Sequence, residues 1–118
     1  MSSVKVSGDS TFTADIPAEG VAVVDFWADW CGPCRAFAPV FEASASQKPT
    51  VTHLKVNVDE SPKLSGQYEI RSIPTTMFLR DGIVVGRIAG ALSATRLADL
   101  IKQTEDLDLN KIKGKVKP

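Results

Sequence analysis

The only two cysteines of this chain stand two residues apart, within the stretch DFWADWCGPCRAFAP at residues 25–39. Gly32 and Pro33 separate Cys31 from Cys34. A disulfide across so short a loop would constrain the unfolded chain little, which makes a structural cross-link a poor explanation of the pair. The pair is better suited to chemistry, as a dithiol that is oxidised to a disulfide and reduced again.

Metal and haem chemistry fit the sequence poorly. Structural zinc normally requires four cysteine or histidine ligands. The chain has only one histidine, His53, in addition to its two cysteines, so we expect no metal site. Covalent attachment of a c-type haem requires a histidine directly after the second cysteine, where this chain has Arg35. A dithiol–disulfide couple is the interpretation that remains.

The elements expected around the cysteines favour this chemistry. Residues 21–27 form a β-branched apolar run, typical of a strand covered on both faces. We expect a helix to begin at Cys31, with Pro33 in its first turn. Unpaired N–H groups and the helix dipole stabilise an anion there, so we assign the nucleophilic thiolate to Cys31. Cys34, one turn further and more sheltered, would be the thiol that resolves the mixed disulfide.

Asp25 is a carboxylate inside the apolar run VAVVDFW. Two interpretations are open from the residues alone. The side chain could occupy an exposed strand position. It could instead be a desolvated carboxyl with a raised pKa, able to take the proton from Cys34 as that thiol attacks.

The rest of the chain predicts an α/β fold. Asp81-Gly82 suits a type I′ hairpin turn between two strands, and Ser61 and Ser93 are candidate helix caps. The order is β-α-β-α-β-α-β-β-α, which predicts a central mixed sheet with helices on both faces. The expected strands lie at 4–7, 21–27 and 50–59 and as a hairpin within 74–90, and the expected helices lie within 8–16, from 31 onward with Pro39 inside, within 61–68 and at 93–104.

Composition limits the possible partners. The chain has 118 residues with 14 basic and 14 acidic side chains, so no net field favours nucleic acid or an anionic membrane. No apolar run approaches the length of a membrane span, and the first residues do not resemble a secretory signal. A cytoplasmic protein is therefore the default expectation, although a signal removed earlier would leave no trace. We expect one domain over 1–104 and a solvated, mobile extension over 105–118; the alternative is that its alternating lysines dock an acidic partner.

Several stretches together are similar to the thioredoxin family over roughly residues 4–104. They are WCGPC behind VVDFWADW, then RSIPTTMFLRDG and GRIAGALS. The resemblance implies the thioredoxin fold and a monomeric protein disulfide oxidoreductase that takes part in electron transport and cell redox homeostasis. It also implies that no cofactor is bound, and that a thioredoxin reductase supplies electrons from NADPH.

The resemblance implies roles for residues outside the cysteine pair. Asp25 matches the family's buried acid, and Lys55 matches a lysine near it that could modulate its pKa; an ordinary exposed strand lysine is the alternative. Ile73-Pro74 matches the cis-proline loop that faces the cysteines and pairs by its backbone with an extended substrate segment.

The remaining positions concern the docking of substrate. Trp30 should flank the cysteines on the docking surface, with core packing as the alternative. Gly32 and Gly90 would keep side chains away from the incoming polypeptide, and Pro33 belongs to the same surface.

The Gly32-Pro33 dipeptide resembles the reducing members of the superfamily, whereas isomerases and oxidases more often carry a histidine there. We therefore expect a reductase; an oxidase or isomerase, and a non-catalytic subunit of the same fold, remain alternatives. Two positions depart from the family pattern. Ser44 stands where an apolar residue would suit the core, and Arg35 stands where a lysine is often found.

Overall fold

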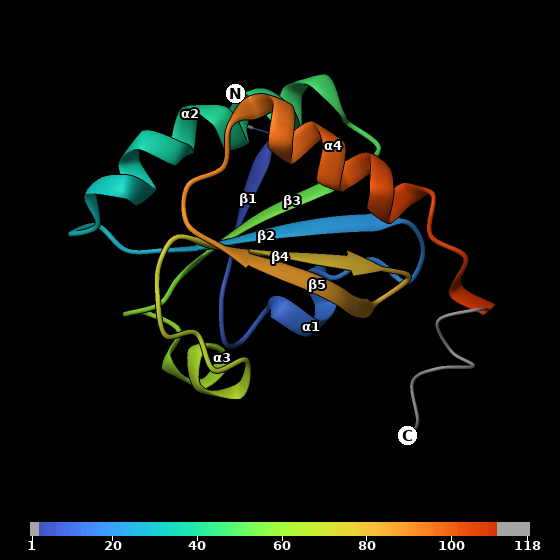
Figure 1. Cartoon of the computed structure of the whole chain (residues 1–118). Coiled ribbons are helices and arrows are strands. Elements are labelled where there is room, and N and C mark those ends of the chain that lie inside the picture. Colours follow the sequence, from blue (N-terminus) through green and yellow to red (C-terminus); the bar gives the residue numbers. More distant parts are fainter. Residues whose placement is uncertain (1–2, 111–118) are drawn as a thin grey trace.

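A single mixed sheet forms the centre of the fold in this computed structural model, which describes residues 3–110 of the 118. The strands lie in the order β1-β3-β2-β4-β5; β1, β2 and β3 are parallel, and β4 and β5 are antiparallel to their neighbours. Helices α2 and α4 cover one face and α1 and α3 the other (Figure 1). The predicted architecture is confirmed. The elements are β1 (Val4–Ser7), α1 (Phe12–Asp15), β2 (Val21–Trp27), α2 (Gly32–Gln47), β3 (Thr52–Asn57), α3 (Pro62–Gln67), β4 (Thr75–Arg80), β5 (Ile83–Ala89) and α4 (Ala94–Glu105).

The central strand β2 divides the core in two. Side chains alternate along a strand, so Ala22, Val24 and Phe26 pack on the α1 and α3 side. Val21 and Val23 pack on the other side, against Phe37 and Phe41 of α2 and Leu97 and Ile101 of α4. Strand β2 is therefore covered on both faces, as its apolar run predicts. By the same alternation, the side chain of Asp25 faces the α2 side.

The turn chemistry and one of the two predicted caps follow the sequence. Asp81 and Gly82 have φ angles of 52° and 80°, the positive values that a type I′ turn requires at both central positions. The Ser93 hydroxyl accepts a hydrogen bond from the Arg96 N–H and caps α4, as predicted.

The predicted cap of α3 is wrong. Ser61 stands at the N-cap position but makes no side-chain cap hydrogen bond. The carboxylate of Asp9 takes that role, because it reaches the N–H groups of Lys63 at 3.1 Å and Leu64 at 2.9 Å. An anion at a helix start is favoured both by the free N–H groups and by the dipole. These two hydrogen bonds join Asp9 to residues that lie 54 and 55 positions later in the sequence.

Ser44 is explained by a buried histidine on the neighbouring strand. The side chain of His53 on β3 is 2% exposed, and its Nδ1–H donates to the carbonyl of Val51 at 2.9 Å. The Ser44 hydroxyl therefore donates to the unprotonated Nε2, also at 2.9 Å. The two polar residues satisfy each other where a pair of apolar side chains would otherwise meet.

Replacing Ser44 with alanine is expected to destabilise the protein by about 1–2 kcal/mol, because the Nε2 of His53 loses its donor. Ser46→Ala is the matched control: it is an exposed serine on the same helix, and it carries the same gain in helix propensity without the hydrogen bond. The free energy of unfolding in urea measures both variants. Equal effects of the two substitutions would contradict the role assigned to Ser44.

Arg80 holds the end of α4 against the sheet. Its Nη1 donates to the carbonyls of Thr104, Glu105 and Leu107 at 3.1, 2.8 and 3.0 Å. The carbonyls at the end of a helix lack partners within the helix, and a guanidinium satisfies them. The predicted extension therefore begins in contact with the domain. Its residues 111–118, with all four alternating lysines, lie outside the described residues.

Candidate active site

Cys31 is the N-cap residue of α2, directly after the loop that leaves β2. Its φ and ψ of −91° and 109° are extended, and its Sγ accepts a hydrogen bond from the Cys34 N–H at 3.2 Å. This is the geometry in which a helix start stabilises a thiolate. The two cysteines form a disulfide with a Cα–Cα distance of 5.3 Å, so the structure is that of the oxidised form.

Exposure does not separate the two cysteines in the disulfide form. Cys31 is 4% exposed and Cys34 is 2% exposed. The assignment of the nucleophile therefore depends on the N-cap position of Cys31 and on the contact that its sulfur makes. Its Sγ lies 3.6 Å from the carbonyl oxygen of Ile73, on the loop expected to receive substrate.

Asp25 is a buried carboxyl on the face of β2 that turns toward α2. It is 4% exposed, and its Oδ1 has no hydrogen-bond partner within residues 3–110. Burial raises the pKa of Asp25 from 3.8 to about 7, and the positive charge of Lys55 offsets this in part. A carboxyl with such a pKa exchanges a proton near neutral pH, so of the two interpretations the buried one holds.

Lys55 lies beside Asp25 on the neighbouring strand. The two Cα atoms are paired between β2 and β3, and the Lys55 ammonium lies 4.9 Å from the centroid of the Trp27 ring. Trp27 packs in turn against the cluster of Ala28, Cys31 and Cys34. The structure thus brings the acid, the lysine and the cysteine pair to one end of β2.

The loop opposite the cysteines has the predicted cis peptide bond between Ile73 and Pro74. The N–H of Gly90 donates to the carbonyl of Pro74 at 2.8 Å and ties this loop to the end of β5. Gly90 has a φ of +98°, a conformation that other residues rarely adopt, so its backbone gives a second reason for glycine at this position.

A shallow groove runs between Trp30 and the cis-proline loop. Trp30 is 68% exposed, and its Nε1–H donates to Asp59 at 2.8 Å, which fixes the indole beside the cysteines. Gly32 and Pro33, between the two cysteines, are also exposed. The cavity here has a volume of about 160 Å³, and because it lies at the loop expected to receive substrate we call it the substrate groove. It is lined by Trp30, Val58, Ile70, Arg71, Ser72 and Ile73.

Sequence reasoning missed several of these groove residues. Ile70, Arg71 and Ser72 directly precede Ile73, so their position next to the predicted loop was an available signal. Val58 and Asp59 follow β3, and only the parallel pairing of β3 with β2 brings them beside Trp30. No local feature of the sequence marks that proximity.

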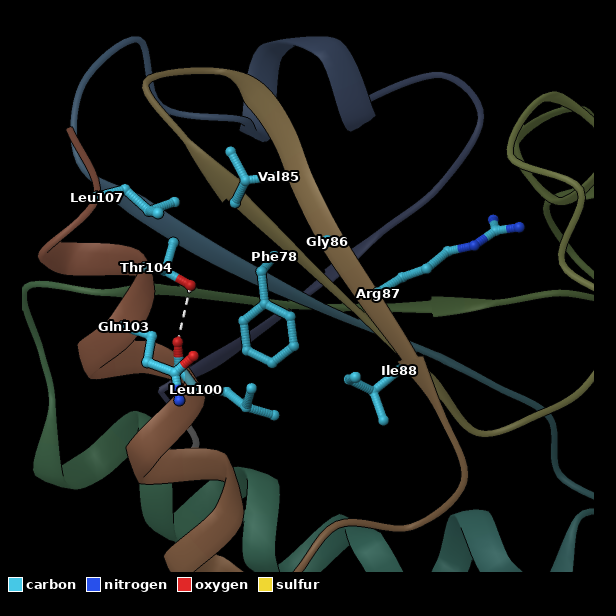
Figure 2. Close-up of a pocket in the computed structure, with 9 residues that line it drawn as sticks. All are labelled: Phe78, Val85, Gly86, Arg87, Ile88, Leu100, Gln103, Thr104 and Leu107. Atoms are coloured by element: carbon cyan, nitrogen blue, oxygen red, sulfur yellow. Dashed lines mark hydrogen bonds between the residues drawn. The ribbon is translucent and has the colours of Figure 1, made fainter. Parts of the chain in front are cut away.

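A second cavity, of about 210 Å³, lies between β5 and α4 (Figure 2). Its lining is mainly apolar, with Phe78, Val85, Ile88, Leu100 and Leu107 around it. Figure 2 shows the hydroxyl of Thr104 turned back to the carbonyl of Leu100, at 2.8 Å, within the helix that forms one wall. None of the predicted site residues lines this cavity.

Residues 3–110 contain no group of three or more His, Cys, Asp or Glu side chains arranged to hold a metal ion. None of the helices described there is long and apolar enough to cross a membrane.

A redox-active cysteine pair at a helix start, a buried acid on the strand that leads to it and a cis-proline loop beside the Cys31 sulfur define a class of protein. The class is that of the protein disulfide oxidoreductases, which exchange a dithiol for a disulfide with their substrates.

The chain belongs to the thioredoxin family, whose model matches residues 3–103. It is 46% identical over 95 residues to thioredoxin 1 of Synechococcus elongatus, covering 79% of this chain and 89% of that protein. It is 43% identical over 100 residues to the thioredoxin of Chlamydia trachomatis, covering 85% and 97%. A mutant thioredoxin from Halobacterium salinarum has a similar solved structure, with a TM-score of 0.81 and 32% identity over 89% of this chain and 93% of that one. The predicted family, fold and oxidoreductase activity are confirmed.

Proposed function

We propose that this protein reduces disulfides in other proteins, with electrons that a thioredoxin reductase supplies from NADPH. The curated relatives named thioredoxin support this, and so does the Gly32-Pro33 dipeptide, which places no histidine beside the Cys31 thiolate. The observation that carries the proposal is the N-cap position of Cys31: its sulfur accepts the Cys34 N–H and lies 3.6 Å from the carbonyl oxygen of Ile73, a residue that lines the substrate groove. We further propose that the protein works as a monomer in the cytoplasm and takes part in electron transport and redox homeostasis there.

The reaction is two successive thiol–disulfide exchanges. The Cys31 thiolate of the reduced protein attacks one sulfur of the substrate disulfide, so a mixed disulfide forms and the first substrate thiolate leaves. Cys34 then gives its proton to the Asp25 carboxylate and attacks the Cys31 sulfur. The Cys31–Cys34 bond forms, the second substrate thiolate leaves, and Asp25 returns a proton to it. Two electrons have passed to the substrate, and the protein is left in the oxidised form seen here.

The other predicted residues serve the substrate or the acid. The charge of Lys55 keeps the pKa of Asp25 from rising further. Trp30, Gly32 and Pro33 form one side of the docking surface. Ile73, Pro74 and Gly90 form the other, where an extended substrate segment pairs with the loop as an added strand.

With NADPH and a bacterial thioredoxin reductase, the purified protein is expected to sustain NADPH oxidation only while insulin is present as the disulfide substrate. The absorbance of NADPH measures this rate directly. Cys31→Ser is the control, and it should give no turnover.

Two results would contradict the proposed direction. Failure to accept electrons from any reductase, together with oxidation of a reduced protein substrate, would favour the oxidase or isomerase. Equal, negligible turnover of the wild type and Cys31→Ser in every assay would favour a non-catalytic subunit.

A further inference from the structure

Residues 69–73, which we call the groove wall, form one side of the substrate groove. The groove wall follows α3 and leads into β4 through the cis-proline loop. Ile70 and Ile73 pack against the core of the α1 and α3 side, whereas Glu69, Arg71 and Ser72 are exposed. Glu69 has a φ of 51°, in the left-handed region that favours glycine, so the chain reverses sharply where the wall begins.

The groove wall stands between two cavities. The substrate groove lies on its Trp30 side, and a third cavity, of about 230 Å³, lies on its β5 side. This third cavity is lined by Glu69, Ile70, Arg71, Ser72, Thr75, Arg87 and Ala89. Open space rather than packed side chains therefore separates much of the wall from β5. The exposed part of the wall has little packing to fix its position.

Arg87 of β5 bridges this space. Its Nη1 donates a hydrogen bond to the carbonyl of Tyr68, the residue directly before the wall. Figure 2 shows the same side chain pointing away from the cavity between β5 and α4 and toward the α3 side of the sheet. The ion pair of Arg71 with Glu69, at 3.6 Å, lies within the wall and cannot tie it to the sheet. Inside the wall, the Thr75 hydroxyl of β4 donates to the carbonyl of Ser72 at 2.6 Å. The ends are reached by Arg87, at Tyr68 before the wall, and by the Gly90 N–H that follows β5, at Pro74 after it.

We propose that Arg87 is a positioning residue for substrate, which holds the groove wall at the distance from Trp30 that an incoming polypeptide requires. The inference rests on the proposed function, because it concerns the binding of protein disulfides to the same groove. Arg87 touches neither the cysteines nor Asp25 in the described contacts, so its loss should leave the chemistry of the cysteine pair intact. A hydrogen bond from a guanidinium to a carbonyl is charge-assisted, and the loss of an exposed one is expected to change substrate binding only a few-fold.

Arg87→Ala is expected to raise the KM for insulin about three- to tenfold with little change in kcat. The rate with a small disulfide such as 2-hydroxyethyl disulfide should stay the same, because that substrate does not span the groove. Arg87→Lys should restore most of the insulin KM, since an ammonium can also donate to the Tyr68 carbonyl. Arg96→Ala is the matched control, an exposed arginine on α4 whose loss should change neither substrate.

Hydrogen exchange of the amides of residues 69–73 tests the tether without reference to activity. Arg87→Ala should speed this exchange, and Arg87→Lys should slow it again. Unchanged exchange, or an equal loss of rate with insulin and the small disulfide, would overturn the inference. If the wild type reduces neither disulfide, the proposed reductase function fails; the exchange measurement still decides whether Arg87 holds the wall.

Discussion

Replacing Cys31 with serine is expected to lower the rate of disulfide reduction roughly 10⁴-fold or more, because the helix start then no longer carries a thiolate that can attack the substrate. Cys34→Ser should behave differently. The hydrogen bond to the Cys31 sulfur comes from the backbone N–H of residue 34, which serine keeps, so the Cys31 thiolate should still form. The first exchange then proceeds, and the second cannot.

Cys34→Ser is therefore expected to accumulate a mixed disulfide with a protein substrate through Cys31. Mass spectrometry after incubation with an oxidised protein measures this adduct, and dithiothreitol should release it. The Cys31→Ser variant is the internal control, since it keeps one cysteine of the pair and should trap little. Efficient trapping through Cys34 in that variant would reverse the assignment of nucleophile and resolving thiol.

Much of the fold could be predicted because its signals are local. The apolar run VAVVDFW marks a strand buried on both faces, and Asp81-Gly82 marks a hairpin through the positive φ angles that its turn requires. The cysteine spacing and the helix that begins there also lie within a few residues of each other. Such patterns reflect the conformation of a few consecutive residues, so they predict correctly that the cysteine pair lies at the start of a helix.

The features that sequence reasoning missed join distant parts of the chain. Asp9 caps a helix 54 positions away, and Arg80 closes the end of α4 from β4. Arg87 reaches Tyr68 across the edge of the sheet. Each is a polar side chain whose partner is a backbone group, and any N–H or carbonyl in the chain could serve equally well. Only the assembled sheet decides which one it meets.

Asp25→Asn is expected to slow the second exchange by about 10- to 100-fold near neutral pH, because the resolving thiol loses its proton acceptor. In the wild type, the rate of this step should rise as the pH passes about 7, where Asp25 becomes a carboxylate. The variant should lack that rise. Above the ordinary thiol pKa of about 8.5 the difference should shrink, because Cys34 then loses its proton to solvent. Stopped-flow tryptophan fluorescence across this pH range measures the step.

The same substitution should make the oxidised protein more stable above pH 7. The pKa of Asp25 is about 7 in the folded protein against 3.8 for an exposed carboxyl. Between these values the folded state binds more protons than the unfolded state, so wild-type stability falls as the pH rises from about 4 to 7 and stays lower beyond. A neutral amide removes this cost, with a gain of as much as about 4 kcal/mol.

If the Asp25→Asn variant is slower but more stable than the wild type, its loss of rate cannot come from damage to the fold. Asp29→Asn is the matched control: its carboxylate is exposed in the same stretch of chain, so the substitution should change neither quantity. Urea unfolding at several pH values gives the stability, and the stopped-flow traces give the rate. A rate that stays unchanged at every pH would remove Asp25 from the mechanism. A loss of rate together with a loss of stability would show that the asparagine disrupts the site instead of removing its base.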